Sequence, residues 1–127
     1  MRDQYSNVSV GQSLAPVVLT ATSTGPAIDL TGYQSAVFAF NCGAIVAAGN
    51  FAPKLQEADA SGGPYTDVAA GDLNGSLPAA LAAATIYKLG YIGRKQFVRH
   101  VLTYVSGTSL AVSISVSLSG ASRRPLP

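Results

Sequence analysis

Acidic side chains gather in one short stretch of the chain, FAPKLQEADASGGPYTDV (51–68). They are Glu57, Asp59 and Asp67, half of the six acidic residues in the 127-residue sequence. Carboxylates at this spacing can hold a metal ion or act as a general acid and base. A calcium loop needs ligands at alternating positions, yet no further carboxylate follows Asp59 until Asp67. A glycosidase groove is normally rich in aromatic residues, and the chain has no tryptophan.

The same stretch is also typical of a strand, a turn and a returning strand. Gly62 and Gly63 allow the backbone to reverse within the loop 60–64. The returning strand then brings Asp67 close to Lys54 or Gln56. We therefore expect a β-hairpin whose acidic side chains face water or form ion pairs, rather than a metal or catalytic site.

The chain has one histidine and one cysteine, His100 and Cys42. Neither a nucleophile elbow nor a phosphate-binding loop accompanies them. Strand alternation places His100 on the same face as Val98 and Leu102, and Cys42 follows the apolar run AVFAFN. We expect a packed or interface histidine and a buried thiol. The sequence therefore predicts no catalytic residue, no metal ligand and no cofactor.

Basic side chains are sparse, and the formal net charge is +2. Their only clusters are Arg94 and Lys95 with Arg99, and Arg123 with Arg124. A nucleic-acid surface normally needs a basic stripe interleaved with stacking aromatics, so we expect no nucleic-acid partner. The N-terminus is polar and no apolar run has the length of a membrane span, so we expect no membrane partner and synthesis in a cytoplasm.

Periodicity predicts mainly strands. In LAVSISVSLSG (110–120), apolar residues alternate with alanine and serine, which is typical of a half-buried strand. Further strands are predicted at 16–22, 34–42, 52–58, 65–69, 86–93 and 96–106. The turn at 106–108 predicts that the last two strands pair as a hairpin. We expect an all-β fold, a single antiparallel β-sandwich or jelly roll of about seven or eight short strands.

Three segments depart from this strand pattern. Ser76 and Pro78 precede an alanine-rich run, which predicts one short helix near residues 78–84. Residues 1–13 are predicted to form an extended N-terminal arm. The tail 121–127 carries two prolines and two arginines and is predicted to be extended as well. The β-sandwich domain is therefore expected to span residues 14–120.

The order of several blocks resembles small virion structural proteins of tailed bacteriophages. The blocks are IDLTGYQSAVFAF, PKLQEADASGGPYTDV, DLNG, KLGYIGRKQFVRHVLT and RRPLP, and they span the chain from Ile28 to its end. The N-terminal segment matches nothing in this pattern. The resemblance implies a head decoration or capsid cement protein, located on the outside of the virion capsid. Its partners would be the major capsid protein and other copies of itself in a homo-oligomer.

On this hypothesis the chain is not an enzyme. The candidate contacts with the capsid or with other copies are the basic residues Arg94, Lys95, Arg99, Arg123 and Arg124. One alternative is a head–tail connector or tail component, which would form a ring of definite copy number. A second alternative is a carbohydrate-binding β-sandwich module.

Overall fold

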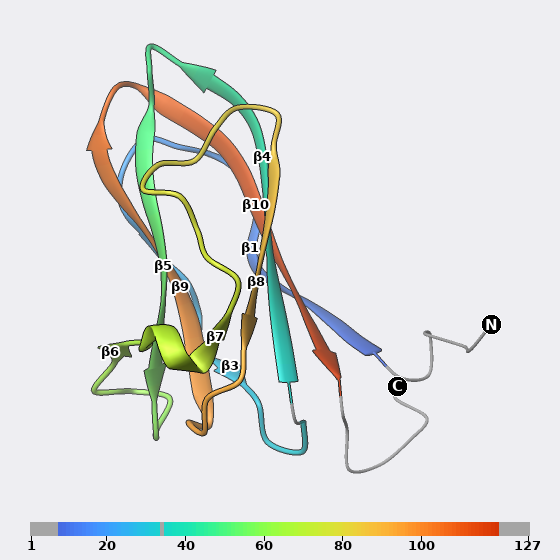
Figure 1. Ribbon diagram of the computed structural model, residues 1–127. Helices are drawn as coiled ribbons and strands as arrows, with labels where there is room; N and C mark the ends of the chain where they lie inside the picture. Colours follow the sequence, from blue (N-terminus) through green and yellow to red (C-terminus); the bar gives the residue numbers. More distant parts are fainter. Residues whose placement is uncertain (1–7, 34, 120–127) are drawn as a thin grey trace, which may run out of the picture.

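The fold consists of two antiparallel β-sheets packed face to face (Figure 1). A computed structural model describes residues 8–33 and 35–119. The elements are β1 (Val8–Leu19), β2 (Ser23–Thr24), β3 (Ile28–Asp29), β4 (Ser35–Val46), β5 (Asn50–Ala58), β6 (Thr66–Asp67), the 3-10 helix η1 (Ala70–Asp72), β7 (Leu73–Asn74), β8 (Ile86–Tyr91), β9 (Phe97–Ser106) and β10 (Ser109–Ser119). The all-β sandwich predicted from the sequence is confirmed.

The strand order places distant parts of the chain side by side. The first sheet has the order β1-β10-β4-β8-β7, and the second has the order β2-β9-β5-β6, with β3 also paired to β9. The two sheets are built around one long antiparallel ribbon. In the first sheet β4 pairs with β10, and in the second their continuations β5 and β9 pair with each other. This ribbon bends from one sheet into the other between Val46 and Asn50. The strand orders β1-β10-β4-β8 and β2-β9-β5-β6, in which early and late strands of the chain alternate, are those of a jelly roll.

Alternation of side chains along the ribbon fills the space between the sheets. In β10 the residues Leu110, Val112, Ile114 and Val116 are buried, and the serines between them are half-buried. The remaining large buried side chains come from both sheets and include Phe38, Phe40, Phe51, Leu55, Leu89, Tyr91, Val98 and Leu102. Burying such apolar and aromatic surface is the main stabilising contribution to this fold.

The predicted hairpin of residues 96–106 with 110–120 is wrong. The strands β9 and β10 follow each other through a short turn, but they lie in different sheets and do not pair with each other. Each is paired instead with the matching half of the β4–β5 segment. A short glycine-containing turn is compatible both with a hairpin and with a corner between two sheets, and long-range pairing decides between them.

The predicted helix near residues 78–84 is also wrong. This segment is irregular, and the only helix among the described residues is η1, a few positions earlier. Two backbone N–H groups of the segment 78–84 donate hydrogen bonds to neighbouring strands. The N–H of Leu81 donates to the carbonyl of Phe51 (3.3 Å), and the N–H of Ala84 donates to the carbonyl of Gly43 (3.0 Å). The Leu81 side chain is buried in the core. Packing and hydrogen bonds to the sandwich therefore override the helix propensity of alanine.

The predicted domain boundaries are only partly within the described residues. The strand β1 begins at Val8 and pairs with β10 from there on, so residues 8–13 belong to the sheet rather than to a separate arm. The rest of the predicted N-terminal arm and the predicted tail 121–127 lie outside the described residues.

Candidate functional site

The loop between β8 and β9 carries two of the predicted contact residues, Arg94 and Lys95. It is held by Tyr91, whose hydroxyl donates to Glu57 Oε1 (2.7 Å) and accepts a hydrogen bond from the backbone N–H of Lys95 (3.1 Å). Because Tyr91 lies in the first sheet and Glu57 in the second, this pair joins the sheets at one end of the sandwich. Burial, together with the Glu57 carboxylate, raises the pKa of Tyr91 and keeps its phenol protonated.

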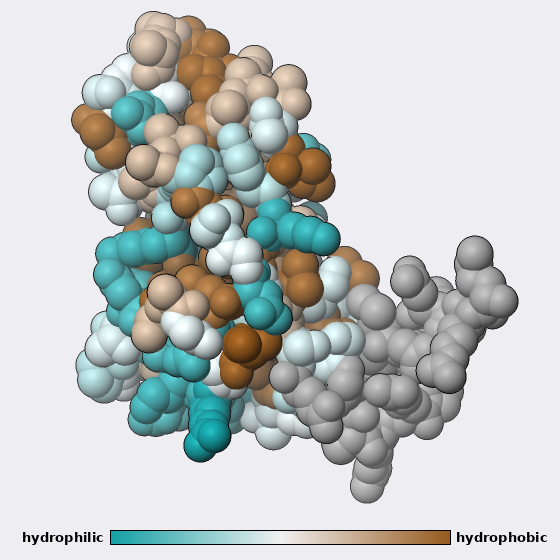
Figure 2. Space-filling view, in the orientation of Figure 1, coloured by the Kyte–Doolittle hydropathy of each residue, from teal (hydrophilic) through white to brown (hydrophobic). Residues whose placement is uncertain are grey.

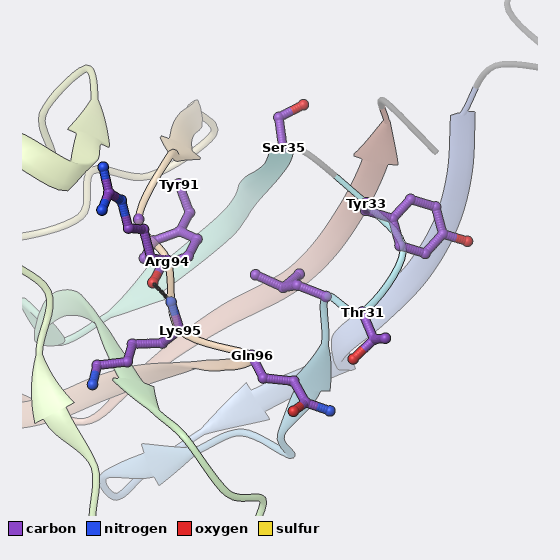
Figure 3. A pocket seen from close by; sticks show the side chains of 9 residues that line it. Thr31, Tyr33, Ser35, Tyr91, Arg94, Lys95 and Gln96 are labelled. Atoms are coloured by element: carbon purple, nitrogen blue, oxygen red, sulfur yellow. Dashed lines mark hydrogen bonds between the residues drawn. The ribbon is translucent and has the colours of Figure 1, made fainter. Parts of the chain in front are cut away.

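A pocket of about 340 Å³ lies beside this loop (Figure 3). Figure 3 shows Tyr91, Arg94 and Lys95 on one side of the pocket, and Thr31 and Tyr33 on the other. The complete lining is Leu30, Thr31, Tyr33, Ser35, Tyr91, Gly93, Arg94, Lys95 and Gln96. Hydroxyl, amide and cationic groups with two aromatic rings can bind a polar ligand by hydrogen bonds and stacking.

The two cations of this loop differ in their partners. The Lys95 ammonium lies 2.9 Å from Asp59 Oδ2, in an exposed ion pair. Within the described residues, Arg94 makes no hydrogen bond or ion pair, and its side chain is exposed. Arg94 is therefore the cation at this end with a guanidinium available to another molecule.

The third predicted contact, Arg99, lies apart from this loop on the outer face of the second sheet. Its Nε and Nη2 both donate to Gln56 Oε1 (3.0 and 2.9 Å), and its guanidinium stacks 3.8 Å from the centre of the Tyr65 ring. These contacts occupy the guanidinium within its own sheet. The structure thus brings Arg94 and Lys95 together but separates Arg99 from them. The other two predicted contacts, Arg123 and Arg124, lie outside the described residues.

The acidic stretch forms the predicted hairpin between β5 and β6. The Lys54 ammonium lies 3.2 Å from Asp67 Oδ1, and Gln56 Nε2 donates to the same oxygen (3.1 Å). Hydrogen bonds from Gln56 and Lys54 lower the pKa of Asp67. The prediction that Asp67 returns to these two residues is confirmed. Across residues 8–33 and 35–119, no group of three or more His, Cys, Asp or Glu side chains could hold a metal ion.

The predicted burial of His100 and Cys42 is confirmed. Both side chains lie between the sheets, and His100 is fully buried. Burial lowers the pKa of His100 to about 4 and raises the pKa of the Cys42 thiol to about 11, so both groups are neutral at pH 7.

Sequence reasoning missed a feature at the opposite end of the sandwich, which we call the uncharged end. It consists of the β4–β5 turn and the β9–β10 turn with their adjoining strand ends (46–50 and 104–109), residues 79–85 of the irregular segment 75–85, and the neighbouring Val17 and Val18. Figure 2 shows mostly white, tan and brown side chains at the top, where Figure 1 places these turns, and more teal below. The described charged residues are Asp29, Lys54, Glu57, Asp59, Asp67, Asp72, Lys88, Arg94, Lys95 and Arg99, and all lie outside this end.

Apolar side chains of the uncharged end are exposed to solvent. The exposed fraction is 51% for Val46 and 56% for Val105, and Val17, Val18 and Tyr104 are exposed as well. The sequence holds a signal for this end in its long segments without a charged side chain, 4–28, 30–53, 73–87 and 101–122. Only the fold shows that these segments meet.

The two turns of the uncharged end are packed backbone against backbone. Gly107 has a φ of 83°, and a Cβ atom there would lie 2.3 Å from the carbonyl oxygen of Ala48. The Tyr104 hydroxyl donates to the carbonyl of Gly107 (2.7 Å), and its ring packs edge-to-face on Phe51. These contacts fix the shape of the uncharged end.

Comparison with known proteins found no family model and no curated sequence that matches this chain. Among the residues that the structure describes, no helix has the length and apolar character of a membrane span.

Proposed function

We propose that this chain is a non-enzymatic structural protein of a tailed-bacteriophage virion, a decoration or cement protein that binds the outside of the capsid and stabilises it. The proposal combines the resemblance of its sequence blocks with one structural observation. The molecule has an uncharged end with exposed apolar side chains, and the charged residues that the structure describes lie elsewhere. The fold alone does not decide the function, because jelly rolls serve many roles.

The uncharged end has the properties of a protein-docking surface. The centres of protein interfaces are depleted of charged residues and enriched in apolar and aromatic ones. Val46, Val105 and Tyr104 can be buried against a partner without removing any charge from water. Because the two turns are already packed together, binding costs little ordering entropy. We propose that this end binds the major capsid protein, and that many weak contacts act together over the shell.

The opposite end of the sandwich, where the β8–β9 loop carries Arg94 and Lys95, is called the charged end, and it then faces solvent or neighbouring copies. Lys95 and Arg99 are engaged by Asp59 and by Gln56 with Tyr65, which leaves Arg94 as the candidate contact to an acidic group. In this arrangement Arg94 and Lys95 contribute at the edges of a homo-oligomer rather than at the capsid surface.

Substitutions at the two ends test the proposal. Val46→Asp combined with Val105→Asp places two charges in the uncharged end, and Val10→Asp is the control, because Val10 is 72% exposed near the other end. The double variant should lose most of its occupancy on purified heads, measured as the ratio to the major capsid protein on a gel. The control should bind like wild type. Equal occupancy of all three proteins would contradict docking through this end.

The number of copies on the same purified particles distinguishes a decoration protein from the head–tail connector alternative. Hundreds of copies per particle support a decoration protein, whereas about six or twelve copies would indicate a ring at the head–tail junction.

The polar pocket beside Arg94 supports the carbohydrate-binding alternative. Tyr33 can stack on a sugar ring, and Thr31 and Gln96 can bond to its hydroxyls. A glycan array gives the test: saturable binding that Arg94→Ala and Tyr33→Ala abolish would favour this function. Binding to heads without any glycan signal would favour the decoration role.

A further inference from the structure

His100 connects the edge strands of the two sheets. It lies on the inner face of β9, and its Nδ1 is 2.5 Å from Ser13 Oγ of β1, the edge strand of the first sheet. Its Nε2 is 3.4 Å from Ser23 Oγ of β2, the edge strand of the second sheet. A single imidazole ring therefore links the two edge strands, β1 and β2, along one side of the sandwich.

A β-bulge positions Ser13 for this contact. Gln12 is opposite Ser115, and Leu14 is opposite Ile114, so β1 has one extra residue at this point. A bulge redirects a side chain relative to simple alternation. Accordingly, Ser13 is buried and the next residue, Leu14, also packs against the core, so two consecutive side chains face inward.

Gly25 confines the imidazole from the other side. A Cβ atom at this position would lie 2.2 Å from His100 Nδ1, so the ring occupies the space that a side chain would need. The backbone N–H of Gly25 also donates to the carbonyl of His100 (3.0 Å). The ring cannot move far without displacing β1 or the segment 23–25.

The surroundings of the ring suit its neutral form. Neutral imidazole has one donor and one acceptor, and each serine hydroxyl can take either role. The ionisable groups on the neighbouring strands are Arg99 and Tyr104 on β9, Lys54 and Glu57 on β5, Cys42 on β4 and Asp29 on β3; β1, β2 and β10 carry none in their described parts. Asp29 is exposed and accepts hydrogen bonds from Thr31 and Gln96. Arg99 and Lys54 bond to partners on the outer face, and Glu57 accepts from Tyr91. A protonated ring would thus be a buried charge without a carboxylate partner, which is costly.

We propose that His100 is an acid-sensitive latch, whose protonation releases β1 and residues 23–25 while the folded ribbon of β4, β5, β9 and β10 remains paired. The low pKa that burial gives His100, about 4, agrees with this role. The folded pKa lies below that of the unfolded chain, so stability is fully present above about pH 6.5 and is lost as the pH falls toward 4. This inference does not depend on the proposed function.

Hydrogen exchange of the full chain between pH 7 and pH 4 tests the latch, after correction for the intrinsic rates. In the wild type, amides of β1 and of residues 23–25 should lose protection by up to about 100-fold over this range, because each pH unit can change the opening equilibrium about tenfold. Amides of β4 and β5 should change far less. In His100→Gln, which cannot be protonated, the protection of β1 should not depend on pH in this range.

A second measurement keeps the test decisive if His100→Gln does not fold. His100 is the only histidine, so its imidazole carbon signal can be followed in the wild-type protein by NMR. A titration that coincides with the loss of protection in β1 supports the latch. The latch is overturned if His100 titrates near 6.5 with β1 still protected, or if all strands lose protection together.

Discussion

At the scale of single residues, polar side chains join the two sheets at two separate places. Tyr91 and Glu57 join them at the charged end, and His100 joins their edge strands through Ser13 and Ser23. Each polar atom there has a nearby partner, and removing one leaves another buried and unsatisfied. Such losses usually cost more than a hydrogen bond contributes.

The Tyr91–Glu57 pair can be tested by a single-atom deletion. Tyr91→Phe removes the hydroxyl and leaves the half-buried Glu57 carboxylate without this donor, so the free energy of unfolding should fall by about 1–3 kcal/mol. Tyr87→Phe is the matched control, because its hydroxyl accepts only an exposed backbone N–H, from Ala82. Urea denaturation measures both variants. Equal losses would show that the bond between the sheets contributes nothing specific.

At the scale of elements, strands with one apolar and one polar face could be predicted correctly from the sequence. The alternation in β10 and the turn between β5 and β6 are local patterns, and both predictions are confirmed. The pairing of β9 was predicted wrongly because its partners in β5 lie 39 to 56 positions earlier, and no local pattern specifies such a pairing. The contact between Ser13 and His100 was not predictable either, since a bulge displaces Ser13 from simple alternation.

The packing of the irregular segment 75–85 can be tested by substituting its buried residue. Leu81 is its buried anchor in the core, so Leu81→Ala should lower the free energy of unfolding by about 2–5 kcal/mol through lost burial and a cavity. If the segment were a surface helix instead, alanine at this position would be tolerated or even favourable. Thermal or urea unfolding distinguishes the two, and Ala83→Ser is an exposed control in the same segment.

At the scale of the whole molecule, the described charged residues lie outside one end, and several apolar side chains are exposed at that end. The sequence-based prediction of contacts relied on the basic clusters, and the structure adds a surface to which none of the described charged residues belongs. Long segments without charged residues carried this information, but only the fold brings them to one end. A salt such as sodium sulfate strengthens binding through an apolar interface and weakens binding through ion pairs, so the two surfaces should respond to salt in opposite ways.

Salt dependence therefore distinguishes the two ends as docking surfaces. If the uncharged end binds the capsid, occupancy on heads should stay constant or rise between about 0.05 M and about 0.5 M sodium sulfate, because apolar burial is strengthened by this salt. If Arg94 and Lys95 carry the contact, occupancy should fall over the same range, because ion pairs are screened. Arg94→Ala provides the check, since it should remove any such decrease without affecting salt-resistant binding.

The folded ribbon has a consequence for the order in which the molecule forms. Along the ribbon, the intervening chain is shortest between Ala58 and Phe97 and longest between Ser35 and Ser119. Loop closure costs less entropy for the shorter separation, so pairing should begin at the first point and proceed through the corner toward the second. The strand β1 can join only when β10 is in place. His100 therefore fastens the last strand to arrive, and the step that completes folding is also the first that acid reverses.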